Sequence, residues 1–148
     1  MGEAVLIQMS QYERRKSLSI YWYNKASDLR GAAGLVWAGM ERDESAETAQ
    51  WLGLGAGFSF RAACWPVYLM LCGLALELLL KASIVEQGRE PKATHKLPAL
   101  WSDAGLGVTK EQKGLLAILA ESIFWDGKYP CRRTRRISTV CPSCRMTI

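Results

Sequence analysis

The chain contains a single histidine, His95, among its 148 residues. This scarcity excludes a metal site built on a His–His pair and a catalytic triad with a second imidazole available as the base. His95 follows a turn and precedes a short predicted helix. That position favours a capping or packing role, in which the ring bonds backbone groups or reaches across to Glu77. A functional role is the alternative interpretation.

Acidic residues are missing from the last part of the chain. Residues 1–130 contain 14 Lys and Arg against 14 Asp and Glu, whereas residues 131–148 contain five Arg and no acid. The net charge of +5 therefore lies entirely in this segment and says little about what the domain binds. We divide the chain into a poorly ordered segment at 1–12, a folded domain at 13–130 and a basic Cys/Arg tail at 131–148. The tail is expected to be either disordered or an abnormal ending.

The N-terminus lacks the basic residues, apolar run and small-residue cleavage site of a signal peptide. Two of the five cysteines, Cys64 and Cys72, lie in the most apolar segment, where a free thiol behaves as a small hydrophobic group. Both observations favour a reducing, cytoplasmic setting. Cys141 and Cys144 form only half of a zinc site, because no second pair follows at regular spacing. We therefore expect neither a metal nor a cofactor.

The sequence has no convincing strand alternation and no internal repeat, and residues 13–40 contain no proline. Apolar residues recur three or four apart, which is the period of an amphipathic helix. An acidic and then glycine-rich stretch at 41–57 predicts a loop or broken helix. Four main helices are expected: Glu13 to about Met40, Pro66 to Gln87, Leu97 to about Ala104, and Lys110 to about Trp125. This pattern predicts an all-α bundle.

Local signals mark the ends of two of these helices. Pro66 suits a first helical turn, and Gly88 suits a C-terminal cap. Thr109 is expected to cap the last helix, with Gln112 completing a capping box. That last helix is expected to bury six apolar side chains: Leu115, Leu116, Ile118, Leu119, Ile123 and Phe124.

The second long helix is apolar almost all round. Residues 62–80 carry one charge in 19 positions, which is enough length to cross a membrane. Glu77 inside this window, Lys81 just after it and the lack of a second such segment favour a helix buried in a bundle. We expect no membrane association.

Glu77 and Lys81 are four residues apart, so they can pair on one helical face. Gly73 lies one turn earlier on that face and leaves room for a neighbouring backbone to approach. One interpretation is a polar seam that fixes how the helix packs. The other is that the carboxylate and the ammonium form the wall of a polar pocket.

Arg89 and His95 are separated by five residues. A histidine and an arginine brought together can cleave RNA without a metal, because the imidazole takes the 2′-OH proton and the guanidinium stabilises the phosphorane. The spacing alone is weak evidence, since a chain holds several arginines near a histidine by chance. Pro91 between them argues against one continuous helix.

Four short segments follow one another in a recognisable order: Tyr21-Trp22…Ala26…Asp28-Leu29, Gly73-Leu-Ala-Leu-Glu77-Leu-Leu-Leu-Lys81-Ala82, Thr94-His95-Lys96-Leu97-x-x-Leu100-Trp101, and Gly127-Lys128-Tyr129-Pro130. Over about residues 12–130 this order resembles the HEPN superfamily. Two motifs depart from the family pattern: its "H-D-L" reads His95-Lys96-Leu97 here, and its "R-Y-P" reads Lys128-Tyr129-Pro130.

The resemblance implies a four- to five-helix up-and-down bundle that forms a homodimer. The superfamily includes RNA-cleaving toxins, phage-defence effectors, partners of minimal nucleotidyltransferases and non-catalytic binding proteins. Its nucleases carry Arg-x(4–6)-His, usually on the last long helix, which here contains no histidine. The resemblance therefore implies a non-nuclease with a pocket at these positions: Glu77, Lys81, His95, Lys128 and Tyr129.

Three functions remain open from the sequence. The first is a non-catalytic binding or accessory protein, associated with a nucleotide or RNA in a defence or toxin–antitoxin context, with a nucleotidyltransferase as a candidate partner. The second is a metal-independent endoribonuclease that uses Arg89 and His95. The third is a structural interaction module without a ligand.

Overall fold

The computed structural model describes residues 10–41 and 45–126, and the regular elements in that part of the chain are all helices. An all-α fold is confirmed there. The expectation of a poorly ordered segment at 1–12 is wrong for residues 10–12, because Ser10 caps α2 and Gln11 and Tyr12 belong to its first turn. Residues 1–9, the tail at 131–148, Lys128 and Tyr129 lie outside the described residues. The elements are α2 (Gln11–Ser17), α3 (Ser19–Met40), α4 (Ser45–Trp51), α5 (Phe60–Glu86), α6 (Leu97–Asp103), α7 (Lys110–Glu121) and a π-helical turn, η1 (Ser122–Asp126).

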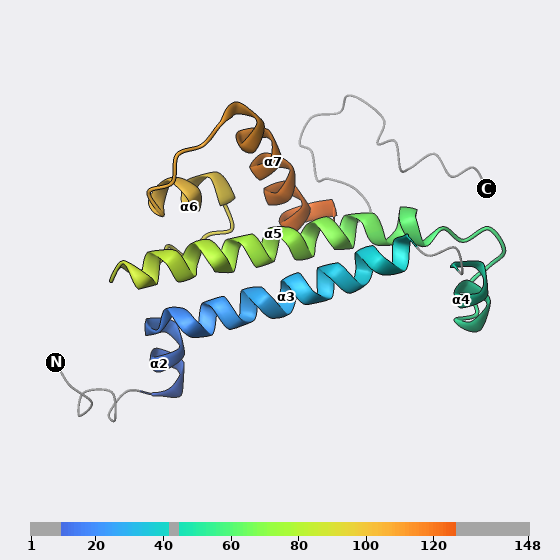
Figure 1. Ribbon diagram of the computed structural model, residues 1–148, viewed down its shortest axis with the longest axis horizontal. Helices are drawn as coiled ribbons and strands as arrows, with labels where there is room; N and C mark the ends of the chain where they lie inside the picture. Colours follow the sequence, from blue (N-terminus) through green and yellow to red (C-terminus); the bar gives the residue numbers. More distant parts are fainter. Residues whose placement is uncertain (1–9, 42–44, 127–148) are drawn as a thin grey trace.

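Two long antiparallel helices, α3 and α5, lie side by side and form the axis of the molecule (Figure 1). The helices α6 and α7, with η1, cover the other side of α5. The short helix α2 lies across the beginning of α3, and α4 lies near the opposite end of the pair. The helix α5 therefore carries neighbours on two sides, and its C-terminal half contains all of its buried residues.

The first predicted helix is two helices. Leu18 separates α2 from α3 because its backbone is extended, with φ −109° and ψ 119°. Ser10 begins α2 with a capping box, since its hydroxyl accepts from the Glu13 amide and the Glu13 carboxylate accepts from the Ser10 amide. This break changes the direction of the chain. The helical periodicity of the apolar residues continues across it from residue 13 to 40, so the sequence pattern does not indicate it.

The second predicted helix begins earlier than Pro66. Ser59 caps α5 by accepting a hydrogen bond from the Ala62 amide, so Pro66 lies inside the helix and not in its first turn. A proline there removes one backbone hydrogen bond, which the rest of a long helix tolerates. Gly88 follows the end of α5 with φ +72°, the left-handed conformation expected of a C-terminal glycine. Thr109 and Gln112 form the predicted capping box of α7.

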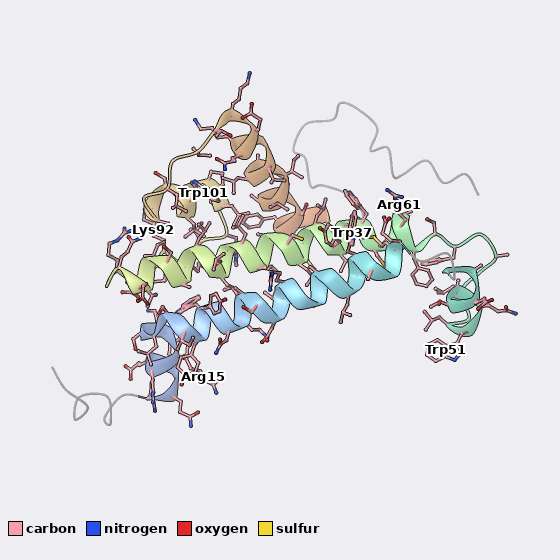
Figure 2. The ribbon with its side chains drawn as sticks, viewed as in Figure 1. Arg15, Trp37, Trp51, Arg61, Lys92 and Trp101 are labelled. Carbon is pink, nitrogen blue, oxygen red and sulfur yellow. The ribbon has the colours of Figure 1, made fainter. Side chains whose placement is uncertain are left out.

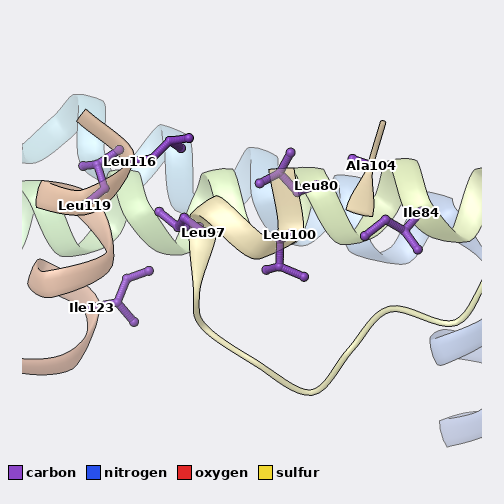
Figure 3. Close-up of a cluster of buried hydrophobic side chains, with 8 residues drawn as sticks. All are labelled: Leu80, Ile84, Leu97, Leu100, Ala104, Leu116, Leu119 and Ile123. Carbon is purple, nitrogen blue, oxygen red and sulfur yellow. The ribbon is translucent and has the colours of Figure 1, made fainter. Parts of the chain in front are cut away.

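The main hydrophobic core lies where α6, α7 and η1 meet the C-terminal half of α5 (Figure 3). Gly73 allows η1 and the end of α7 to approach α5, as its position suggested. A Cβ atom on Gly73 would lie 2.9 Å from the Leu119 carbonyl oxygen and 2.9 Å from Cγ1 of Ile123. The core residues are Leu80, Ile84, Leu97, Leu100, Ala104, Leu116, Leu119 and Ile123.

Two expectations about burial need correction. Of the six apolar side chains predicted to be buried by the last helix, three are buried, because α7 packs through only one stripe of its surface. Leu115, Ile118 and Phe124 are 54%, 55% and 43% exposed. The helix α5 is also less enclosed than a central bundle helix, since no residue at 60–72 is buried. Among the described residues, α5 is the one helix long and apolar enough to span a membrane, and 17% of its most apolar window is buried.

Candidate functional site

Three polar side chains meet between α5 and the linker at residues 87–96. Glu77 and Lys81 come from successive turns of α5, and His95 comes from the end of the linker. Lys81 Nζ donates to Glu77 Oε1 at 2.6 Å, and His95 Nδ1 lies 2.8 Å from Glu77 Oε2. One carboxylate is therefore held from both sides, and we call these three residues the polar centre.

Burial makes the two partners of Glu77 necessary. Glu77 is 2% exposed and Lys81 is 7% exposed, whereas the His95 side chain is 52% exposed. A buried carboxylate without hydrogen bonds would cost several kcal/mol, which explains why both of its oxygens are engaged. Among the described residues, no buried side-chain nitrogen or oxygen lacks a partner. The polar centre is thus a satisfied cluster with one member, His95, open to solvent.

Aromatic rings flank the polar centre on both sides. Lys81 Nζ lies 5.8 Å from the ring centroid of Trp22, which is the distance of a cation–π contact. Trp22 is fixed in turn, because its indole Nε1 donates to the Lys16 carbonyl at 2.9 Å. On the other side, the rings of His95 and Phe124 meet edge to face with centroids 5.7 Å apart. Sequence reasoning assigned neither aromatic residue to the site.

The two residues proposed for RNA cleavage have separate partners. Arg89 donates hydrogen bonds to the Gln87 side chain and to the Asp103 carbonyl, which ties the end of α5 to the end of α6. His95 is bonded to Glu77. No hydrogen bond or ion pair joins Arg89 to His95 in the part of the chain described here. The geometry does not assemble the pair that metal-free cleavage requires.

A cleft of about 750 Å³ opens beside Lys81, on the Trp22 side of the polar centre. Its walls come from α2, α3, α5 and the linker between α5 and α6. We call it the aromatic–cationic cleft. Its lining residues are Tyr12, Arg15, Lys16, Tyr21, Trp22, Asn24, Lys25, Asp28, Leu78, Lys81, Glu90, Pro91, Lys92 and Ala93.

Cations outnumber acids around this cleft, with five Lys and Arg against one Asp and one Glu. Both acids face a lysine of the same cleft: Lys16 pairs with Glu90, and Lys25 Nζ lies 4.0 Å from Asp28. The Lys16 hydrogen bond and charge hold the pKa of Glu90 below its usual value. Since Lys81 is bonded to Glu77 and Lys92 is paired with Asp103, Arg15 is the one cation of the lining without an ion pair to a described residue.

Besides Lys81, two of the five cations have no acid of the cleft as a partner. Lys92 pairs at 2.9 Å with Asp103, which lies outside the lining, and Arg15 makes no ion pair with any described residue. Figure 2 places Arg15 and Lys92 at the same end of the α3–α5 pair, where α2 joins it. Sequence reasoning missed Arg15, Lys92 and Tyr12, because they line one cleft only through the way in which α2 and the linker fold back.

The structure brings together the three described members of the predicted pocket: Glu77, Lys81 and His95. Lys128 and Tyr129 lie outside the described residues. Within the described part there is no group of three His, Cys, Asp or Glu side chains arranged to hold a metal ion. Comparison of the chain with models of known protein families, with characterised proteins and with solved structures finds no match.

Proposed function

We propose that this protein is a HEPN-like, non-catalytic binding protein that forms a homodimer and holds a nucleotide or RNA. The observation that carries the proposal is the aromatic–cationic cleft, which is lined in part by Lys81 of the polar centre. Proteins that bind single-stranded nucleic acid combine a positively charged groove with aromatic rings on which bases stack. The walls of this cleft supply both kinds of side chain.

The polar centre supports binding in preference to catalysis. Lys81 and His95 both contact the Glu77 carboxylate, so Glu77 orders the wall of the cleft and orients the imidazole. Metal-free RNA cleavage needs a cation that stabilises the charge developing on phosphorus. The two candidate cations are already engaged, because Arg89 is hydrogen-bonded to Gln87 and Asp103, and the Lys81 ammonium is hydrogen-bonded to Glu77.

The endoribonuclease remains the second candidate because of one specific feature. A half-exposed imidazole held through Nδ1 by a buried carboxylate is the arrangement of an oriented general base. With Nδ1 bonded to Glu77, the Nε2 atom of His95 is left to face a substrate. His95 is therefore the residue on which the two functions make opposite predictions.

A paired binding and cleavage experiment separates them. Fluorescently labelled single-stranded RNA is incubated with the full chain, and anisotropy and fragment length are measured on the same samples. We expect binding in the micromolar range, which is about −8 kcal/mol, with intact RNA throughout. The variant His95→Ala should then leave RNA integrity unchanged.

Cleavage by the wild-type chain that His95→Ala abolishes, at an unchanged melting temperature, would establish the nuclease instead. The matched control is Lys96→Ala, which changes the neighbouring exposed residue and leaves the polar centre intact. Absence of both binding and cleavage would favour the third function, an interaction module without a ligand.

A further inference from the structure

We propose that one end of the molecule inserts into the surface of a lipid bilayer through the apolar side chains where α3, α4 and α5 meet. It lies at the opposite end of the α3–α5 pair from Arg15 and the aromatic–cationic cleft (Figure 2). The inference therefore does not depend on the proposed function. The exposed side chains of this surface, which we call the aromatic end, are Trp37, Trp51, Leu52, Phe58 and Trp65.

The chain around the aromatic end carries almost no charge. Residues 48–76 contain one charged side chain, Arg61, and its guanidinium lies 3.9 Å from the Glu41 carboxylate. Surfaces that bind another protein have a polar rim around an apolar centre. A lipid bilayer instead accepts long uncharged stretches and strongly disfavours ionised groups. The composition of this segment favours lipid as the partner.

The rest of the chain leaves this apolar segment uncovered. No residue at 60–72 is buried, and 17% of the most apolar window of α5 is buried. At the end of α4 and the start of the following loop, Trp51 is 83% exposed and Leu52 is 50% exposed. A contiguous apolar surface of this kind marks a site of interaction.

The tryptophans fall into two groups by their hydrogen bonds. Trp22 and Trp101 each donate their indole N–H to a backbone carbonyl at 2.9 Å. Within the described part of the chain, the indole nitrogens of Trp37, Trp51 and Trp65 have no acceptor. A large apolar ring with a free N–H donor settles where hydrocarbon meets the polar headgroups. The three tryptophans of the aromatic end have this chemistry.

Packing holds two of these tryptophans in place before any contact with lipid. The Trp37 ring centroid on α3 lies 6.2 Å from that of Trp65 and 5.2 Å from that of Tyr68, both on α5. Because the rings already support one another, little side-chain entropy is lost when they enter the bilayer. The aromatic end is a preformed surface.

Only the N-terminal half of α5 is available to the bilayer. The C-terminal half contains all of the buried residues of this helix, among them Glu77 and Lys81, and it packs against α6 and α7. A spanning α5 would carry both charges into hydrocarbon. The sequence-based expectation of no membrane association rested on these two residues, which oppose a span but lie outside the aromatic end. The protein therefore lies on the bilayer without crossing it.

The charges near the aromatic end specify the kind of lipid surface. In the described part of the chain they are Glu41, Glu47 and Arg61, so no excess of positive charge attracts anionic headgroups. Apolar area must then supply the binding free energy. We expect the protein to bind vesicles of zwitterionic phosphatidylcholine, with little dependence on salt.

Flotation with phosphatidylcholine vesicles at low and at high salt tests the proposal. Trp51→Glu and Leu52→Ser alter the aromatic end. Their matched controls are Tyr12→Glu on α2 and Leu115→Ser on α7, because these side chains are 75% and 54% exposed and lie on other elements. All four side chains are at least half exposed, so each variant should keep the melting temperature of the wild type.

We expect the full chain to float with the vesicles equally well at both salt concentrations. Trp51→Glu should lower the partition coefficient about tenfold, and Leu52→Ser about threefold, because a charge or a hydroxyl replaces apolar area that enters the bilayer. The two control variants should float as the wild type does. If Trp51→Glu lowers the melting temperature, Leu52→Ser supplies the comparison with a folded chain.

Four results would overturn the inference. A wild-type chain that does not float would show that lipid does not cover the aromatic end. Flotation that requires anionic phosphatidylserine and is lost at high salt would indicate charge attraction. Equal losses in the variants and their controls would indicate unspecific adhesion of exposed apolar side chains. Flotation that neither Trp51→Glu nor Leu52→Ser weakens would place the contact on another surface.

Discussion

At the scale of single residues, the central fact is a carboxylate almost without access to water. Glu77 is accompanied by one cation from its own helix and by an imidazole from the linker. Such a cluster adds little net stability compared with apolar residues of similar size, since two charges must be desolvated to make it. Its effect is to fix positions: Lys81 faces Trp22, and His95 faces Phe124.

Lys81→Met should therefore lower the stability of the protein more than a double variant that removes both the Lys81 and the Glu77 charge. The single variant leaves a buried carboxylate with one partner and should lower the free energy of unfolding by about 3 kcal/mol. The double variant Glu77→Gln/Lys81→Met removes the uncompensated charge and should recover more than half of that loss. Urea unfolding followed by tryptophan fluorescence measures both values at pH 7. A double variant less stable than the single one would contradict this account.

At the scale of elements, the contact between α5 and the α7–η1 segment depends on the absence of a side chain. Gly73 is buried, and the Leu119 carbonyl oxygen and the Ile123 side chain occupy the space that a Cβ atom would need. The backbone oxygen cannot move without shifting the end of α7. That shift would also disturb Phe124, which lies against His95. The glycine thus positions one flank of the polar centre.

Gly73→Ala should destabilise the protein although alanine is the better helix former. Overpacking costs about 1–3 kcal/mol, and this exceeds the gain in helix propensity of about 1 kcal/mol. Gly34→Ala on α3 is the matched control, because a Cβ atom added there would meet no neighbouring element within 4 Å. The control should gain about 0.5–1 kcal/mol. Thermal unfolding of the two variants should shift in opposite directions, and a shift in the same direction would refute the packing argument.

At the scale of the whole molecule, the helices leave much apolar surface uncovered. Two adjoining grooves run between α3 and α5, and both are lined by Tyr23, Leu76 and Leu79. Leu79 is 46% exposed at their junction, between Glu77 and Lys81 on the helix that carries the polar centre. Contiguous apolar surface of this kind marks an interaction site in soluble proteins. It is the surface on which we expect the proposed homodimer to form.

Leu79→Glu should convert the dimer to a monomer without unfolding the chain. A charge placed at the centre of an apolar interface has no partner and must be desolvated, which weakens association by about 2 kcal/mol or more. Light scattering after size-exclusion chromatography measures the mass. Leu35→Glu is the control, since this side chain is 78% exposed and lines neither groove. A wild-type chain that is monomeric, or a Leu79→Glu variant that stays dimeric, would contradict this assignment.

The amino-acid sequence by itself determines the local part of this structure. Helical periodicity, the capping box at Thr109 and the left-handed glycine at Gly88 depend on neighbours along the chain, so they can be predicted from the sequence alone. The Glu77–Lys81 pair belongs to the same category, because 3.6 residues per turn place positions four apart on one face. The break at Leu18 escapes sequence reasoning, since a single extended residue does not interrupt the apolar pattern.

Tertiary structure decided everything that depends on distance through space. His95 contacts Glu77 although it lies 18 positions further along the chain, and Arg89, six positions before His95, bonds elsewhere. The aromatic–cationic cleft requires α2 to fold back toward the linker, a turn that no local motif specifies. Burial also depends on tertiary packing. The helix α7 carries apolar residues on several faces, but only the stripe that meets α5 and α6 is buried. Periodicity indicates which residues can be buried, and the arrangement of the helices selects which of them are.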